Sequence, residues 1–165
     1  MSVMIIACDP PKAFDTYSEE FRHVMKTETG FLRGLSPGMP LAQVKEIEKW
    51  PLKDEEPNYL FYEQYDTLGR MNTLEINFEN GLKELRLDSY FISAAEARSF
   101  FNELKEFYTA RFGESEDYYG FSGWNFEIDE RVFNIELNDE SAEYRQGKIS
   151  LFVYEHIPET PKKPK

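Results

Sequence analysis

The sequence has little of what metal sites, disulfide scaffolds and membrane-spanning helices require. Its 165 residues include one cysteine and two histidines, which excludes an internal disulfide and leaves too few nitrogen and sulfur ligands for a zinc site. No apolar run approaches the roughly 20 residues of a transmembrane helix. A glycine-rich phosphate loop is absent, and the serine of Gly-Phe-Ser-Gly (120–123) lacks the strand–turn–helix pattern of a hydrolase. We therefore expect no cofactor and no metal.

Basic residues are also scarce. Asp and Glu outnumber Lys and Arg by 31 to 19, and the formal net charge is -12. Such a field repels phosphate backbones, which argues against nucleic acid as a ligand. The negative charge favours solubility, and it also suits a basic protein partner.

The spacing of apolar residues predicts three helices. Apolar positions three and four residues apart between Phe14 and Met25 place one stripe on a first helix. A second helix follows Pro40, which fits a first helical turn, and ends before Pro51. The third covers 94–112, after a Ser-x-x-Glu capping pattern at 93–96 and before a glycine at 113.

Six segments alternate apolar and polar residues or are rich in aromatic residues, as strands are: 59–65, 72–78, 82–88, 123–129, 131–137 and 148–154. Asn80-Gly81 between two of them is a strong hairpin signal, because both residues tolerate positive φ. The predicted fold is a two-layer α+β protein of tandem ααβββ and αβββ units. These units would form one curved antiparallel sheet with helices packed on one face. The first unit would span 14–92 and the second 93–157, followed by a disordered tail, 158–165.

Two stretches, GMPLAQVKEIEKWPL (38–52) and TLEINFENGLKELRL (73–87), resemble the BamE-like (SmpA/OmlA) family of outer-membrane lipoproteins. The matching positions are Gly38, Met39, Val44, Pro51, Leu74, Ile76, Phe78, Gly81, Leu82 and Leu85. The duplicated plan is similar to that of β-lactamase-inhibitory protein. The sequence departs from the family where Lys49-Trp50-Pro51 replaces Gly-x-Pro, and the second unit lacks a Gly-Met pair. The resemblance implies the fold and the character of a binding protein, but it transfers no partner-contacting residue.

The N-terminal segment has two interpretations. Ile5-Ile6-Ala7-Cys8 fits a lipobox, and members of the family are exported lipoproteins, so 1–13 would be a lipobox-like segment and tether with lipidation at Cys8. A signal peptide would also need a basic start and a longer apolar core ahead of the cysteine. The alternative is that Val3–Ala7 forms a buried edge strand, with Cys8 as a small hydrophobic residue.

The aromatic content, 14 Phe, 10 Tyr and 2 Trp, exceeds what the predicted core stripes use. If Ile149, Leu151 and Val153 face the helices, alternating residues of the last strand face away from them. We expect these residues, with Tyr62 and acidic neighbours, to form a partner-binding face: Phe152, Tyr154, Tyr62, His156, Glu75, Glu84, Asp88, Glu127 and Glu136. Large aromatic side chains are enriched in protein interfaces. The alternative is that a chain terminus covers these rings.

The sequence therefore predicts a non-catalytic, protein-binding lipoprotein that faces the periplasm, either an assembly factor or an inhibitor or immunity protein. One alternative is a cytoplasmic acidic immunity protein against a basic toxin or nuclease. A third is a hydrolase that uses a pair of carboxylates, which would need a deep pocket and a carboxyl group of raised pKa. The sequence does not indicate an oligomeric state.

Overall fold

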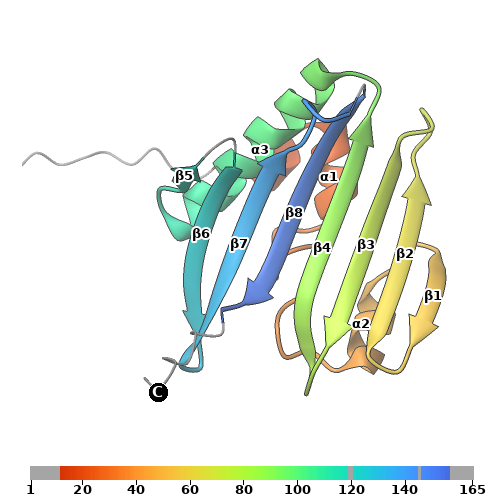
Figure 1. Cartoon of the computed structure of the whole chain (residues 1–165), viewed down its shortest axis with the longest axis vertical. Helices are drawn as coiled ribbons and strands as arrows, with labels where there is room; N and C mark the ends of the chain where they lie inside the picture. Colours follow the sequence, from red (N-terminus) through yellow and green to blue (C-terminus); the bar gives the residue numbers. More distant parts are fainter. Residues whose placement is uncertain (1–11, 119–120, 145, 157–165) are drawn as a thin grey trace, which may run out of the picture.

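Over the residues that the structure describes, the protein is an α+β protein with one eight-stranded antiparallel sheet and three α-helices (Figure 1). The computed structural model describes residues 12–118, 121–144 and 146–156. Its helical elements are the 3-10 helix η1 (Phe14–Thr16), α1 (Glu19–Met25), α2 (Leu41–Ile47) and α3 (Ala94–Phe112). Its strands are β1 (Leu52–Glu56), β2 (Tyr59–Tyr65), β3 (Met71–Phe78), β4 (Leu82–Phe91), β5 (Glu116–Tyr118), β6 (Phe121–Ile128), β7 (Arg131–Asp139) and β8 (Gly147–Glu155).

The sheet consists of two four-stranded meanders joined at their last strands. The strand order is β1-β2-β3-β4-β8-β7-β6-β5, with β4 antiparallel to β8 and the sheet not closed. The prediction of three strands in each unit was wrong by one strand at each edge, because β1 and β5 were not expected. Every residue of these two strands is exposed, so neither carries the apolar alternation by which the other six were identified.

Helix α3 lies against β6, β7 and β8, and Figure 1 shows the helices on one side of the sheet. The spacing of apolar residues in 94–112 predicts an inward stripe of Ala97, Phe100, Phe101, Leu104, Phe107, Tyr108 and Phe112. Five of these seven are buried, and Phe101 and Phe112 are partly buried against the core. Opposite them, Leu74, Leu87, Leu151 and Leu137 form one buried row that crosses four strands in register. The core therefore lies between this face of the sheet and the helices.

The first predicted helix is interrupted. Residues 14–16 form η1, and α1 begins only at Glu19, because Tyr17 is extended, Ser18 has a ψ of 159°, outside the helical range, and the Ser18 hydroxyl caps α1 by accepting a hydrogen bond from the Phe21 N–H. Both the N–H and the hydroxyl of Ser18 donate to the Glu103 carboxylate of α3, at 2.8 and 2.6 Å. The apolar stripe persists across the break, since Tyr17 and Phe21 are buried.

The glycines of the family-like stretches meet in space. The N–H of Gly38 donates to the carbonyl of Leu82, and the N–H of Leu82 donates to the carbonyl of Met39, both at 2.8 Å. A Cβ atom on Gly81 would lie 2.5 Å from the Gly38 carbonyl oxygen. At the start of β8 in the second meander, Gly147 approaches α3 in a similar way, with a Cβ position 2.5 Å from the carbonyl oxygen of Ser93. In each meander, a glycine at or just before the start of the last strand thus lies near the start of a helix.

Candidate functional site: the open face of the sheet

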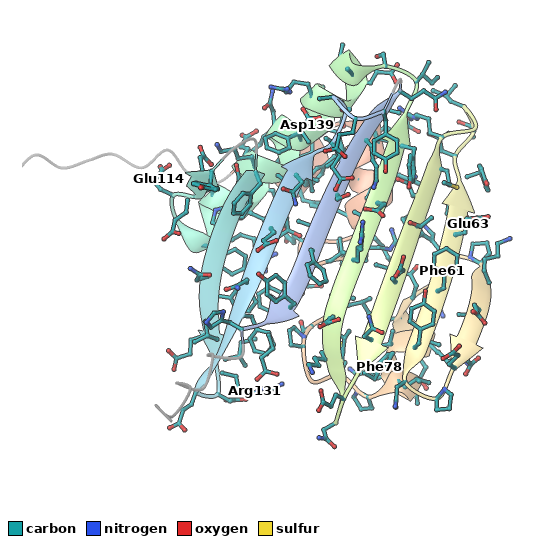
Figure 2. All side chains as sticks on the ribbon, in the orientation of Figure 1. Phe61, Glu63, Phe78, Glu114, Arg131 and Asp139 are labelled. Atoms are coloured by element: carbon teal, nitrogen blue, oxygen red, sulfur yellow. The ribbon has the colours of Figure 1, made fainter. Side chains whose placement is uncertain are left out.

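The side of the sheet that faces away from the helices, which we call the open face, carries the side chains expected to bind a partner. Cross-strand register aligns Phe61, Glu75, Arg86, Phe152 and Glu136 in one row from β2 to β7. Figure 2 views the sheet from this side, with the helices behind it and Phe61 labelled on β2. The row combines two aromatic rings with three charged groups, and aromatic residues and arginine are enriched in protein interfaces.

Eight of the nine predicted face residues lie where the alternation of the strands placed them. Five of them are half-buried on the open face: Phe152, Tyr154, Glu75, Glu84 and Glu136. Asp88 is buried there. Glu127 and His156 are exposed near the lower end of the face, by which we mean the end where β8 finishes, and the upper end is the one where β8 begins. Cys8 lies outside the described residues. The placement of these side chains agrees with the sequence, although placement alone does not test partner binding.

The prediction for Tyr62 was wrong. Tyr62 pairs with Leu74 of β3, is only 3% exposed and belongs to the core between sheet and helices. Burial, together with the charges of Glu48 and Glu55, raises the pKa of its hydroxyl to about 12. In Tyr-Leu-Phe-Tyr (59–62) aromatic residues occupy both faces, so aromatic character could not decide the orientation. The orientation could have been inferred from Leu60, the aliphatic residue of the stretch, which points to the core. Alternation then puts Tyr62 in the core and Tyr59 and Phe61 on the open face.

At the lower end of the open face, Phe152 and Tyr154 form a stacked pair. Their ring centroids lie 4.7 Å apart with an interplanar angle of 29°. The Tyr154 hydroxyl donates a 2.6 Å hydrogen bond to Oε1 of Glu136, and Glu84 pairs with Tyr154 from β4. Burial and the neighbouring Glu136 carboxylate raise the pKa of Tyr154. This group joins two aromatic rings to two carboxylates.

At the upper end, a lysine of β8 is enclosed by the chain itself. Lys148 is 4% exposed, and its Nζ lies 2.6 Å from Glu140 and 3.8 Å from Asp88. The rings of Tyr144 and Tyr90 lie 4.9 and 5.7 Å from the same Nζ. Burial opposes the charge of Lys148, but the bond to Glu140 and the charge of Asp88 outweigh it and raise the pKa of the ammonium group.

Exposed apolar side chains gather at this upper end, where connections between strands meet. Tyr65 and Leu68 lie at the β2–β3 turn, Ile92 follows β4, and Tyr144 precedes β8; they are 52%, 64%, 60% and 43% exposed. Tyr65, Tyr90 and Ile92 also line a shallow recess of about 280 Å³. The apolar surface therefore continues from the open face onto these turns.

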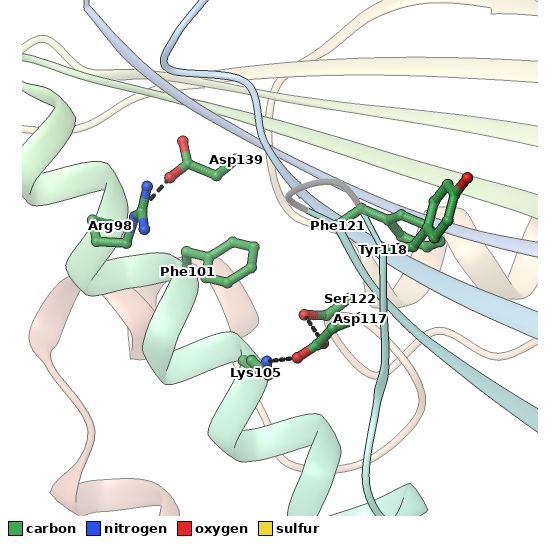
Figure 3. Close-up of a pocket in the computed structure, with 8 residues that line it drawn as sticks. All are labelled: Arg98, Phe101, Lys105, Asp117, Tyr118, Phe121, Ser122 and Asp139. Carbon is green, nitrogen blue, oxygen red and sulfur yellow. Dashed lines mark hydrogen bonds and ion pairs between the residues drawn. The ribbon is translucent and has the colours of Figure 1, made fainter.

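A recess of about 320 Å³ lies between α3 and the β5–β6 edge. Figure 3 shows the residues that line it. Its polar groups are paired with one another: Arg98 with Asp139 at 2.8 Å, and Lys105 with Asp117 at 2.6 Å. Hydrogen bonds from Lys105, Ser115 and Ser122 lower the pKa of Asp117 to about 2. Such a carboxylate stays ionised near neutral pH and is poorly suited to act as a general acid.

A second recess, of about 410 Å³, lies between α1 and the β2–β3 turn. Burial and the nearby Asp66 raise the pKa of Glu20 against the opposing charge of Arg70. Arg70 bonds both carboxylates, with Nε 2.5 Å from Asp66 and Nη2 on Glu20. This pair of acids is thus the closest match to the hydrolase alternative, but the shared guanidinium makes it an ion-pair triad that ties α1 to the turn.

Within the described ranges, no group of three or more His, Cys, Asp or Glu residues is arranged to hold a metal ion. Among the same residues, no helix has both the length and the apolar character needed to cross a bilayer. No protein-family model, curated protein or solved structure matches the chain.

Proposed function

We propose that the chain is a non-catalytic protein-binding module that holds its partner on the open face of the sheet. The observation that carries the proposal is the position of Phe61, Phe152 and Tyr154. These rings lie on the side of the sheet away from the helices, among carboxylates, and they are only half-buried. Rigid aromatic side chains supply contact area at low entropic cost and often anchor protein interfaces. The repeated helix-and-meander order also supports a tandem of two related units.

We further propose that the protein works as a lipoprotein of the bacterial cell envelope, anchored at Cys8 and facing the periplasm. The support is the Ile-Ile-Ala-Cys stretch and the resemblance to the BamE-like family. An assembly factor and an inhibitor or immunity protein both fit this surface. The second candidate is a cytoplasmic immunity protein, which the net charge of -12 favours because an acidic face complements a basic toxin.

Site-specific photocrosslinking in the native host tests the binding face. A photoreactive residue at Phe61 or Phe152 should crosslink one recurrent partner that is identifiable by mass spectrometry. The matched control positions are Asn102 and Ala110, which are exposed on α3. Crosslinks from the α3 positions alone would refute the open face as the binding surface.

Intact mass separates the two cellular settings. The protein expressed from its full native gene is recovered from the membrane and soluble fractions and weighed. A species that begins at Cys8 and carries acyl chains supports the envelope proposal. A soluble species that retains the residues before Cys8 supports the cytoplasmic immunity protein.

A further inference from the structure

The chain repeatedly places its own cations against an aromatic ring and a carboxylate together. The Arg33 guanidinium lies 3.7 Å from the centroid of Trp50 and bonds Glu48 through Nε and Nη2 at 2.7 and 2.8 Å. Ring and carboxylate act on the cation from different directions, so both attractions operate at once.

Two further sites follow the same plan. Arg131 lies 5.2 Å from the Phe133 ring and bonds both carboxylate oxygens of Glu155, at 2.8 and 2.6 Å. Lys148 at the upper end of the open face lies between tyrosine rings and the carboxylates of Glu140 and Asp88, as described above. In each case a cation of this chain fills the site.

The lower end of the open face has the rings and the carboxylates, and among the described residues no Lys or Arg side chain is placed against both. Glu84 accepts a 3.4 Å hydrogen bond from the Asn77 amide, and the Lys83 ammonium acts on Glu84 only through its charge, because it bonds Glu79. Phe152 and Tyr154 supply stacked rings, and Glu136 and Glu84 flank them from β7 and β4. Neither ring makes a cation–π contact, and neither carboxylate forms an ion pair, with any Lys or Arg in the part of the chain that the structure describes.

The cation that strand pairing brings nearest to the aromatic pair is Arg86, and it bonds Asp88 instead. Arg86 pairs with Phe152 across β4 and β8, but its Nε lies 3.3 Å from Oδ2 of Asp88, toward the upper end. Asp88 is also held by the Ser150 hydroxyl at 2.5 Å. Arg86 and Lys148 thus pair with carboxylates at the upper end, and Lys83 pairs with Glu79, so neither Glu84 nor Glu136 beside the aromatic pair forms an ion pair among the described residues.

We propose that this position binds an arginine side chain of the protein partner, stacked on the Phe152–Tyr154 pair and bonded to Glu136 and Glu84. The inference rests on the proposed function of the open face and names the group that the face recognises. Arginine fits better than lysine because its planar guanidinium stacks on aromatic rings and bonds carboxylates through several N–H groups. The site of Arg33, Trp50 and Glu48 is a related arrangement within this chain, with one ring and one carboxylate around a guanidinium.

An NMR titration of the full ¹⁵N-labelled chain tests the inference with three blocked tripeptides, Gly-Arg-Gly, Gly-Lys-Gly and Gly-citrulline-Gly. The arginine peptide should shift backbone amides around 84, 136 and 152–154, and it should bind about fivefold more tightly than the lysine peptide. Citrulline has nearly the shape of arginine but no charge, so its peptide should cause no shifts there. Raising the salt concentration should weaken the binding of the arginine peptide.

Variants locate the effect. The double change Glu84→Gln and Glu136→Gln should lower the affinity for the arginine peptide about tenfold, because it removes two charges from the site. The control Glu63→Gln removes one charge from the same face, where Glu63 lies 4.0 Å from Lys53, and it should leave binding unchanged. Phe152→Leu keeps an apolar side chain but removes a ring, and it should lower the affinity for the arginine peptide about threefold.

Shifts spread over the acidic surface, or equal binding by wild type and the double variant, would overturn the inference. The result also separates this inference from the proposed function. If the Phe152 position crosslinks a partner but no arginine peptide binds there, the open face is the binding surface and the arginine site is wrong. If the crosslinks also fail, the proposed function itself is wrong.

Discussion

The hydroxyl of Tyr154 donates a 2.6 Å hydrogen bond to Oε1 of Glu136 across the β7–β8 pair. The bond runs diagonally, because Glu136 pairs directly with Phe152 and not with Tyr154. Tyr154 therefore leans over the Phe152 ring, which explains how two residues of one strand come to stack. One bond thus orders two rings and a carboxylate on the open face before any partner arrives, and such preorganisation reduces the entropic cost of binding.

Phe152 and its neighbour Leu151 should respond differently to truncation. Leu151 is fully buried between the sheet and the helices, so Leu151→Ala should lower the free energy of unfolding by about 2–5 kcal/mol. Phe152 is only half-buried on the other face, so Phe152→Ala should cost about 1 kcal/mol or less and preserve the fold. Urea denaturation followed by far-UV circular dichroism gives both values. Equal losses would show that Phe152 is a core residue and would argue against the open face as a binding surface.

Gly81→Ala should be strongly destabilising. The glycine has φ of +112°, and an added Cβ would lie 2.5 Å from the Gly38 carbonyl oxygen, which is backbone and cannot rotate away. We expect a loss of about 3 kcal/mol, from strain together with the displacement of the 38–39 segment. Gly69→Ala is the matched control, since Gly69 has φ of +78° and nothing within 4 Å of its Cβ position. It should cost about 1 kcal/mol in the same urea assay, and equal losses at the two positions would mean that the contact with Gly38 is unimportant.

The sequence predicted the helices and central strands well because their apolar residues repeat with clear periods. The bounds of α3 match the predicted range 94–112, and the Asn80-Gly81 turn has φ of +56° and +112° at its two residues. The edge strands β1 and β5 could not be found this way, since all their side chains are exposed and pairing alone makes them strands. The break at Ser18 depends on Glu103, which is 85 residues away in the chain, so no local pattern could reveal it.

The open face could be predicted only in part, because some of its contacts join segments that are distant in the sequence. Alternation along β8 was enough to place Phe152 and Tyr154, because Leu151 and Val153 next to them are clearly apolar. The enclosure of Lys148 and the diagonal bond from Tyr154 to Glu136 arise from cross-strand register and from the β7–β8 connection. Neither relationship is encoded in the spacing of residues along one strand.

Tyr62→Phe should be neutral or stabilise the protein by up to about 1 kcal/mol, since the buried Tyr62 hydroxyl has no hydrogen-bond partner among the described residues. The variant should also change alkaline stability. The pKa of Tyr62 is raised to about 12, so the folded state retains this proton while the unfolded chain, with a pKa of about 10, loses it. Wild-type stability should therefore fall as the pH rises from about 10 to 12, and Tyr62→Phe should lose less. Urea unfolding at pH 8 and pH 11 gives the free energy of unfolding of both proteins. If wild type and Tyr62→Phe differ in stability by the same amount at the two pH values, the raised pKa of Tyr62 is contradicted.

The buried pair of Arg33 and Glu48 should control stability in acid. Their side chains are 3% and 0% exposed, and Glu48 also accepts the N–H groups of Lys49 and Trp50 at 2.7 and 2.8 Å. Glu48→Gln should cost about 3–5 kcal/mol at pH 7, because it leaves the buried Arg33 charge without its counterion. The exposed Glu56→Gln is the control and should cost less than about 0.5 kcal/mol.

The pH dependence distinguishes this ion pair from simple packing. Burial opposes the Glu48 charge, but the hydrogen bonds and charge of Arg33 outweigh it and lower the pKa of the carboxyl group. A lowered folded-state pKa gives stability that is present above the unfolded value of about 4.3 and is lost as the pH falls through the folded value. The stability gap between wild type and Glu48→Gln should therefore narrow progressively below about pH 4. Unfolding curves that stay parallel from pH 7 to pH 2 would show that the variant acts through packing, whereas converging curves would assign the loss to the charge of Glu48.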